Sequence, residues 1–444
     1  MAAMRFVPWL RVLRGASGFT AVVQTGVATV LVLAVNVVTG IVSARVLGPQ
    51  GRGELSALLL CPQFLSFLFV LGLPTSMIVR IKSRPNGASG LMGAALLLST
   101  GMGMIAALAG AALIPVLLKQ YDAHLIAVAR GLLIFVVLGA TSTVVLAALQ
   151  LQNRFGAYNR LRFSQSVLTL LALVSLALLH SFTPVTGALA YVLPALPFFL
   201  GNLWWVIREF RPRFSGWRRN SAELLSYGVR VHMMDVGNTL FTQLDKVILV
   251  AVLAPAMFGL YVVVFNLSRL VTTFANSATP VLLPRAAGKS APEVLALTSR
   301  AFTATTVLTV AAVLGFVLLG RVGLRLLYGE QFASGYSILV ILCFEGALAS
   351  SAAVLQQPYL VLNRPGTVAS FHMASLTLAG VLVYLGASRF GAEGAAGGLL
   401  AATSLRFVLT YSGFGRMLGV RAPPLLPTRT ELLTLLSRLR ARVA

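Results

Sequence analysis

The sequence predicts an all-α polytopic membrane protein in which twelve transmembrane helices form two six-helix repeats around a central cavity. Three observations predict this class: the composition, the distribution of basic residues and an internal repeat. Of 444 residues, 58% are hydrophobic and only 10% are charged, with a mean hydropathy of +0.89. A soluble protein of this length could not bury so much apolar surface, so the chain is expected to span a membrane many times.

The apolar segments are each long enough, or nearly so, to cross a hydrocarbon core. They cover residues 20–44, 55–79, 89–117, 123–150, 163–181, 184–207, 224–252, 257–284, 298–319, 335–363, 366–387 and 393–418. Nearly all connections between them are short. We therefore expect no loop to fold as a separate catalytic domain, and we expect no catalytic residues.

The two ends of the chain are basic. Residues 1–19 carry Arg5, Arg11 and Arg14 among apolar residues at helical spacing, which predicts an amphipathic segment on the cytoplasmic membrane surface. Residues 419–444 predict a basic cytoplasmic tail helix beginning near Thr428, where a capping-box pattern follows three prolines. A solvated tail without regular structure is the alternative reading.

Basic residues are distributed unequally between alternate loops. With the amino terminus in the cytoplasm, 24 Lys and Arg residues fall on the inner side and 6 on the outer side. This asymmetry follows the positive-inside rule and predicts a multi-pass protein of the cytoplasmic (inner) membrane with both termini cytoplasmic. It also accounts for the net charge of +24 without a nucleic-acid partner. The two cysteines, Cys61 and Cys343, lie in apolar segments without neighbouring ligand residues, so we expect no metal site.

An internal repeat is visible at an offset of 206 residues. Residues 46–49 (VLGP) match residues 252–255 (VLAP), Gly53 matches Gly259, and Pro74 matches Pro280. Parallel repeats of this kind build transporters whose substrate cavity lies between the halves. We therefore divide the chain into an N-lobe over 20–207, a polar cytoplasmic linker over 208–223 and a C-lobe over 224–418.

The seventh apolar segment carries an unusual polar stripe. Its members follow one another at intervals of three, four and three residues and share one helical face: Asp235, Asn238, Thr242 and Asp245. At the 206-residue offset, three polar residues of the first segment correspond to members of this stripe: Thr29, Asn36 and Thr39. Polar residues inside spans are costly in hydrocarbon and usually mark functional sites.

Charged residues inside the predicted spans are mostly basic: Arg130, Arg230, Lys246, Arg269 and Arg406 against Asp235, Asp245 and Glu345. The arginines are candidates for a cationic substrate-binding cavity, because guanidinium binds phosphate oxygens in a bidentate manner. Pairing with a buried carboxylate, or extension of the side chain to the membrane surface, is the alternative.

The three carboxylates are candidates for coupling transport to H⁺ or Na⁺, since a buried carboxyl group can take up and release a cation. Asp235 is the preferred candidate. For Glu345 a role as the partner of a buried arginine is the preferred alternative, and for Asp245 the alternative is an ion pair or gate contact involving Lys246. His232 and His372 are either proton relays or packing residues. No other cofactor is expected.

Several short motifs occur in an order that resembles the polysaccharide flippases of the multidrug/oligosaccharidyl-lipid/polysaccharide exporter superfamily. They are residues 44–53 (ARVLGPQGRG), 72–74 (GLP), 242–246 (TQLDK), 258–261 (FGLY), 283–285 (LPR), 327–332 (LYGEQF), 362–365 (LNRP) and 391–396 (GAEGAA). The resemblance implies a Wzx-like protein that moves lipid-linked oligosaccharide units from the inner to the outer leaflet by alternating access. It also implies a cationic cavity for the diphosphate and, as partners, membrane lipids, a polysaccharide polymerase and glycosyltransferases.

Two other functions remain as alternatives. An ion-coupled multidrug extruder has the same fold, but organic cations require acidic surroundings and the charges within these spans are net basic. A membrane-embedded glycan ligase or glycosyltransferase would be expected to present acidic or histidine residues in a sizeable outer loop. Because the predicted outer loops are short, we expect a transporter and not an enzyme.

Overall fold

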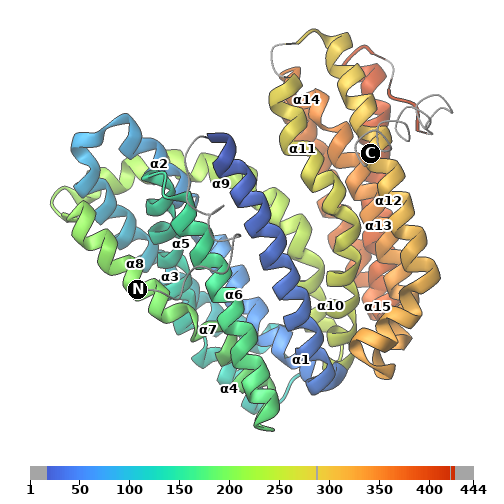
Figure 1. Ribbon diagram of the computed structural model, residues 1–444, viewed down its shortest axis with the longest axis horizontal. Helices are drawn as coiled ribbons and strands as arrows, with labels where there is room; N and C mark the ends of the chain where they lie inside the picture. Colours follow the sequence, from blue (N-terminus) through green and yellow to red (C-terminus); the bar gives the residue numbers. More distant parts are fainter. Residues whose placement is uncertain (1–17, 287–288, 421, 426–444) are drawn as a thin grey trace, which may run out of the picture. The chain divides into compact units, whose positions relative to one another are not determined.

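The computed structural model describes residues 18–286, 289–420 and 422–425, excluding the side chains of 18–28, 233–242, 280–281 and 283–285. The segment predicted over 1–19 and the helix predicted within 419–444 therefore lie almost entirely outside the described residues. Within the described ranges every regular element is an α-helix or a short 3-10 helix (Figure 1). The all-helical prediction is confirmed.

The chain forms two compact units, Met1–Val236 and Gly237–Ala444. The helices of the first unit are α1 (Gly18–Phe69), α2 (Leu73–Ser83), η2 (Pro85–Gly87), α3 (Ala88–Leu117), α4 (Ala123–Gly131), α5 (Ile134–Leu151), α6 (Phe155–Leu178), α7 (Pro184–Val192) and α8 (Ala195–Phe210). The helices of the second unit are α10 (Pro255–Ser268), η3 (Arg269–Thr272), α11 (Thr273–Ala286), α12 (Ala291–Tyr328), η4 (Glu330–Gly335), α13 (Tyr336–Leu355), α14 (Gln357–Val361) and α15 (Pro365–Met417). Helix α9 (Trp217–Val252) contributes to both.

The boundary between the units lies within α9 and not in the connection that precedes it. Non-helical backbone joins α8 to α9 over residues 211–216 only, so the remainder of the predicted 208–223 linker is helical. The first turns of α9 contact α2 of the first unit: Ser76 Oγ donates to the Leu224 carbonyl at 2.7 Å, and Arg84 pairs with Glu223 at 3.1 Å. The amino-terminal part of α9 is thus an integral part of the first unit.

In the first unit, α1 packs along α6 and α3 packs along α5. A core of buried apolar residues from α2, α3, α5, α8 and α9 includes Leu73, Met77, Met92 and Leu224. The connection before α2 approaches α9 closely, because a Cβ atom on Gly72 would lie 2.4 Å from the Gly228 carbonyl oxygen. Gly72 also has a positive φ of 65°, a conformation that favours glycine.

In the second unit, α13 packs between α12 and α15 and also contacts α10 and η3. Aromatic residues from three helices form a separate core, in which Tyr359 packs edge-on against Phe371 and Phe414. Two polar residues of α13, Glu345 and Ser350, are buried.

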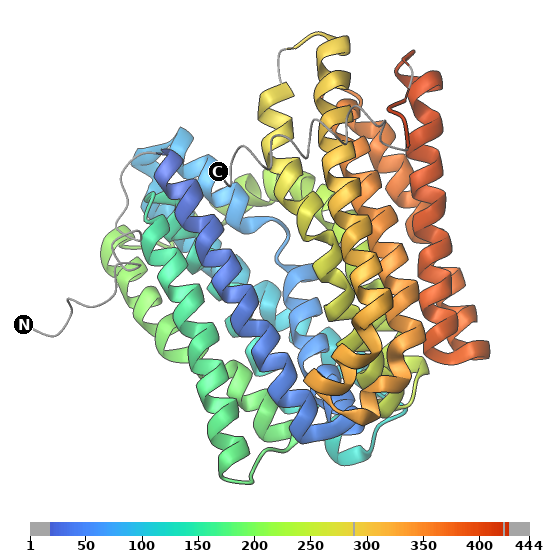
Figure 2. The ribbon, with the colours of Figure 1, turned by 45° about the vertical axis from the view of Figure 1, so that its right-hand side comes forward.

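The longest helices are interrupted at single glycines. Helix α15 has 53 residues and would be about 80 Å long if straight, against a hydrocarbon core of about 30 Å. It turns back at Gly391, where φ is 62°, and its two halves then touch: a Cβ on Gly394 would lie 2.2 Å from the Gly386 carbonyl oxygen. In α1 the chain bends at Gly48, which has φ 66° and ψ −177° (Figure 2).

By length and composition, the described residues contain nine helices that could cross a membrane. The first and the last of these stretches, at 55 and 53 residues, include the interruptions at Gly48 and Gly391. These helices establish a multi-pass membrane protein, while the count of twelve spans in two repeats stays a prediction.

Candidate functional site

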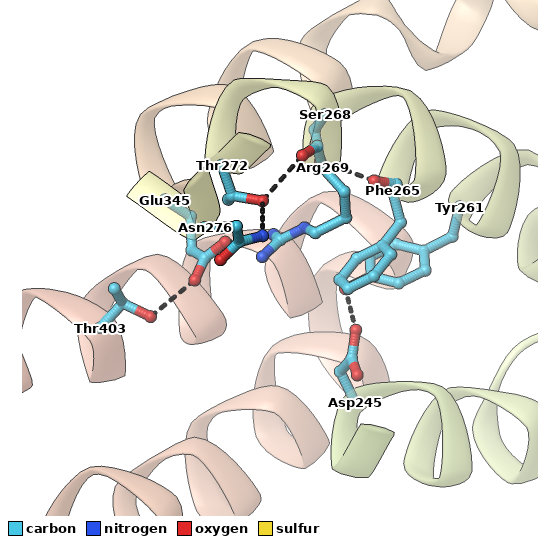
Figure 3. Close-up of polar contacts among 9 residues, drawn as sticks. All are labelled: Asp245, Tyr261, Phe265, Ser268, Arg269, Thr272, Asn276, Glu345 and Thr403. Carbon is cyan, nitrogen blue, oxygen red and sulfur yellow. Dashed lines mark hydrogen bonds and ion pairs between the residues drawn. The ribbon is translucent and has the colours of Figure 1, made fainter. Parts of the chain in front are cut away.

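Charged residues from several helices of the second unit, among them Asp245 and Glu345, lie around η3, a short 3-10 segment between α10 and α11 (Figure 3). Side-chain hydroxyls here return to backbone carbonyls one turn earlier: Ser268 Oγ donates to the Phe265 carbonyl at 2.8 Å and Thr272 Oγ1 to the Arg269 carbonyl at 2.7 Å. Such bonds compete with the regular helical pattern and bend helices. A 3-10 stretch between helices often marks a functional position, and this one begins with Arg269.

Arg269 pairs with Glu345 of α13. Its Nη2 donates to Glu345 Oε2, and the other carboxylate oxygen accepts a hydrogen bond of 2.8 Å from Thr403 Oγ1 of α15. The Glu345 side chain is only 1% exposed, whereas that of Arg269 is 30% exposed. The carboxylate is therefore fixed between two helices, and the guanidinium occupies the more accessible side of the pair.

The Phe265 ring lies between two cationic side chains. The Arg269 guanidinium carbon is 4.3 Å from the ring centroid and Lys246 Nζ is 4.2 Å from it. Lys246 also donates to Gln243 Oε1 at 2.9 Å. Cation–π contacts of this kind stabilise charge where water is scarce, so the ring helps to accommodate two like charges near one another.

Asp245 is buried beside this group. Tyr261 donates its hydroxyl proton to Asp245 Oδ2 at 2.8 Å (Figure 3), while Oδ1 has no hydrogen-bond partner among the described residues. Asp245 interacts electrostatically with both Lys246 and Arg269. The carboxylate thus offsets part of the surrounding positive charge through space, while its direct hydrogen bond is to the tyrosine.

Arg406 of α15 lies one turn after Thr403 and is 6% exposed. It interacts electrostatically with Glu345 and with Arg269. A series of hydrogen bonds begins at the backbone carbonyl of Arg406. Thr410 Oγ1 donates to this carbonyl, and Gln356 Nε2 donates to Thr410 Oγ1 at 3.3 Å. His372 contacts Gln356 Oε1 at 3.1 Å, so this histidine belongs to a hydrogen-bonded network.

The structure brings together five of the predicted charged residues. They comprise three cations and two anions, all in the second unit: Asp245, Lys246, Arg269, Glu345 and Arg406. We call this group the η3 cluster. Glu345 thus pairs with an arginine, and this arginine is partly exposed.

The other predicted site residues lie elsewhere. Arg130 is an exposed residue of the first unit whose Nε donates to the Ala111 carbonyl at 3.3 Å, and Arg230 is exposed on α9. Of the predicted stripe on α1, Thr39 is buried and donates to the Val35 carbonyl, whereas Thr29 and Asn36 are exposed. The side chains of three stripe residues on α9 lie outside the described part of the chain: Asp235, Asn238 and Thr242.

His232 contacts the Leu68 carbonyl at 2.9 Å and packs at a tilt against the Phe67 ring. This arrangement within the first unit is that of a hydrogen-bonded packing residue. In the described ranges, no three His, Cys, Asp or Glu residues come together in a way that could hold a metal ion.

Sequence reasoning missed Tyr261, Thr403 and Phe265 as members of the site. A signal existed for Tyr261, because Asp245 and Tyr261 are equidistant from Leu253 in the turn between α9 and α10. Residues placed symmetrically about a short turn come level in an antiparallel helix pair. Thr403 had no such signal, since it reaches Glu345 from a helix 58 residues further along the chain.

Comparison with solved structures shows which known proteins share this fold. The lipid II flippase MurJ, in an inward closed conformation, matches with a TM-score of 0.74 at 13% identity, over 88% of this chain and 87% of that one. An inward-facing multidrug resistance MATE family transporter of the MOP superfamily matches with a TM-score of 0.67 at 15% identity, over 89% and 97%. A MOP superfamily transporter from Pyrococcus furiosus matches with a TM-score of 0.57 at 15% identity, over 93% and 98%. The chain thus has the fold of MOP superfamily transporters.

The family follows from the sequence match. The chain belongs to the family described as polysaccharide biosynthesis protein, whose sequence model matches residues 42–336, more than half of the chain. Agl15 of Haloferax volcanii, described as a probable low-salt glycan biosynthesis flippase, is 22% identical over 195 residues. That alignment spans 43% of this chain and 40% of the relative.

Proposed function

We propose that this protein moves lipid-diphosphate-linked oligosaccharide units across the cytoplasmic membrane by alternating access, for surface polysaccharide biosynthesis. The observation that carries the proposal is family membership combined with the net positive η3 cluster inside apolar helices. The similarity to Agl15, which is described as a probable flippase, and the similarity in fold to the lipid II flippase MurJ both support this function. The protein acts as a transporter and not as an enzyme.

The charge of the cluster suits the chemistry of the cargo. A lipid-linked sugar carries its negative charge at the diphosphate, next to the lipid, and this group has to cross the middle of the membrane. Transfer of an isolated anion into hydrocarbon is prohibitively costly. A cluster with one more cation than anions attracts such a group and offsets part of its desolvation.

We further propose twelve spans in two lobes, 20–207 and 224–418, with both termini in the cytoplasm. The residues paired by the 206-residue offset, Gly48 and Ala254, support the repeat, because each has non-helical dihedral angles directly before a proline. The antiparallel contact at Gly394 supports counting α15 as two spans. The segment 208–223 then joins the lobes on the cytoplasmic side.

Transport against a gradient requires a source of free energy. We propose H⁺ or Na⁺ coupling through the carboxylates of the second lobe: Asp235, Asp245 and Glu345. The partners are the lipid-linked oligosaccharide and the surrounding lipids, with a polysaccharide polymerase and glycosyltransferases acting on the same lipid carrier.

Extrusion of multidrug cations is the rival function, because a multidrug resistance MATE transporter shares the fold. The positive surplus of the η3 cluster disfavours it, since a cationic drug would be repelled there. The test is transport of a fluorescent lipid-diphosphate oligosaccharide and of a fluorescent organic cation by the same reconstituted protein. Export of the cation alone would overturn the proposal.

The sharpest variant for this test is Arg269→Ala. We expect the initial rate of lipid-diphosphate transport in proteoliposomes to fall at least about tenfold, because a charge-assisted hydrogen bond is lost. Arg269→Lys should restore only part of the rate, since an ammonium group lacks the bidentate fork. Arg325→Ala, which removes an exposed ion pair with Glu330, is the matched control. A folded Arg269→Ala protein that transports at the wild-type rate would contradict a cationic site at this residue.

A further inference from the structure

One carboxylate of the η3 cluster, Glu345, has two cationic neighbours. Glu345 is hydrogen-bonded by Arg269 and interacts electrostatically with Arg406. Both oxygens of Glu345 are already occupied, Oε2 by Arg269 and Oε1 by Thr403.

Arg269 retains donors that Glu345 does not use. The contact with Glu345 is made through Nη2, whereas Nε, which is itself buried, has no acceptor among the described residues. A guanidinium group offers five N–H donors in a planar fork. With the side chain 30% exposed, an anion that reaches this fork meets a cation whose charge is partly neutralised by Glu345.

An incoming diphosphate and the Glu345 carboxylate are thus both anions that can bind the Arg269 guanidinium. The carboxylate does not become isolated when the diphosphate takes Arg269, because Thr403 keeps its hydrogen bond and Arg406 supplies the opposite charge. This matters energetically, since a buried carboxylate left without a partner costs several kcal/mol.

We infer that Glu345 is an internal counter-anion, which holds Arg269 in the substrate-free protein and competes with the diphosphate of the transported lipid. The inference rests on the proposed function and adds a specificity-determining residue to it. An anion must displace Glu345 from Arg269 in order to bind, so an anion with low affinity for Arg269 is not transported. It also expels the cargo after translocation, when Glu345 returns to Arg269.

The test is equilibrium binding of farnesyl diphosphate to the purified full-length protein in lipid nanodiscs. Glu345→Gln removes the competing charge at constant size, and we expect about tenfold tighter binding, within the usual range of coupling free energies between sites. In the Arg269→Gln background the same change should give no gain, because the two residues compete through one contact. Export by Glu345→Gln should be slower than wild type despite tighter binding, since release is impaired.

A folding defect would be separated from loss of competition by two further measurements. Glu345→Asp keeps the buried charge but shortens its reach, so binding should tighten by less than with glutamine. Farnesyl diphosphate should also raise the Tm of Glu345→Gln by more than that of the wild type, because the ligand replaces the missing anion. Glu330→Gln, the same substitution in an exposed ion pair, should behave as wild type in every assay.

The outcomes are distinct. Wild-type binding together with unchanged or weaker binding by folded Glu345→Gln would overturn the inference and leave the proposed function intact. Binding of farnesyl diphosphate by none of the proteins would overturn the proposed function and, with it, the inference.

Discussion

At the scale of single residues, the two carboxylates of the η3 cluster have different environments. Glu345 has hydrogen bonds to both oxygens, one of them from a guanidinium. Asp245 has a single neutral donor, Tyr261, and one oxygen without a partner in the described part of the chain. A buried carboxylate is stabilised in its charged form by donors and opposite charges, so Glu345 is the better fixed of the two.

Asp235 remains the preferred coupling residue by its place in the polar stripe. We expect Asp235→Asn to abolish stimulation of transport by an imposed H⁺ or Na⁺ gradient, because an amide cannot exchange a proton or offer a negative charge to a cation. Protein level and binding of farnesyl diphosphate should stay near wild type. Proteoliposomes with and without the gradient provide the measurement, with Glu330→Gln as the control. Undiminished gradient-driven transport would make Asp235 a structural residue.

At the scale of helices, close contacts depend on glycine. The halves of α15 meet where Gly386 and Gly394 allow the backbones to touch, and Gly398 approaches Leu382 in the same way. Small residues in such positions let helices in membranes approach closely and gain van der Waals contact. The contact brings the second half of α15, with Thr403 and Arg406, into a fixed relation to the first.

Alanine substitutions of two glycines that lie one turn apart, Gly394 and Gly397, test this contact. Gly394→Ala should destabilise the protein by about 1–3 kcal/mol, because its Cβ would overlap the Gly386 carbonyl oxygen and force the backbones apart. Gly397→Ala meets no atom within 4 Å and should be neutral or stabilising by up to about 1 kcal/mol, since alanine favours helix. Thermal unfolding of the detergent-purified variants gives the comparison. Equal stability of the two variants would show that the close approach is not required.

At the scale of the whole molecule, each unit has its own buried core. Leu73, Met77 and Leu224 belong to the core of the first unit, and Tyr359 and Phe414 to that of the second. A unit with its own core can move as one body, which alternating access requires. Helix α9 is continuous from the first unit into the second.

The orientation of the chain can be tested by cysteine labelling. Cys61 and Cys343 are buried, so a membrane-impermeant maleimide should leave the natural protein unlabelled. Ser181→Cys, at an exposed site between α6 and α7 and at the predicted outer end of the fifth apolar segment, should be labelled in intact cells. Ser215→Cys, an exposed site between α8 and α9, should be labelled only after permeabilisation. Labelling of Ser215→Cys in intact cells would contradict the charge-based topology.

Much of the fold could be predicted from the sequence, because hydropathy and charge act locally along the chain. Long apolar segments must form helices in a membrane, since every backbone polar group there has to be satisfied internally. The sequence alone therefore determined the all-helical class, identified Arg269, Glu345 and Arg406 as charged residues of apolar segments, and carried the motifs of the family.

Only the tertiary structure decided which of those charges meet. Arg269 and Glu345 are 76 residues apart, and their contact depends on the rotation of two helices about their axes and on the packing of α13 against η3. Thr403, which no periodicity had indicated, reaches Glu345 through the same packing, whereas Arg130 belongs to the other unit. Hydropathy specifies that a segment lies in the membrane, but the facing of its polar side chains is set by close packing between helices, and that is a property of the folded molecule.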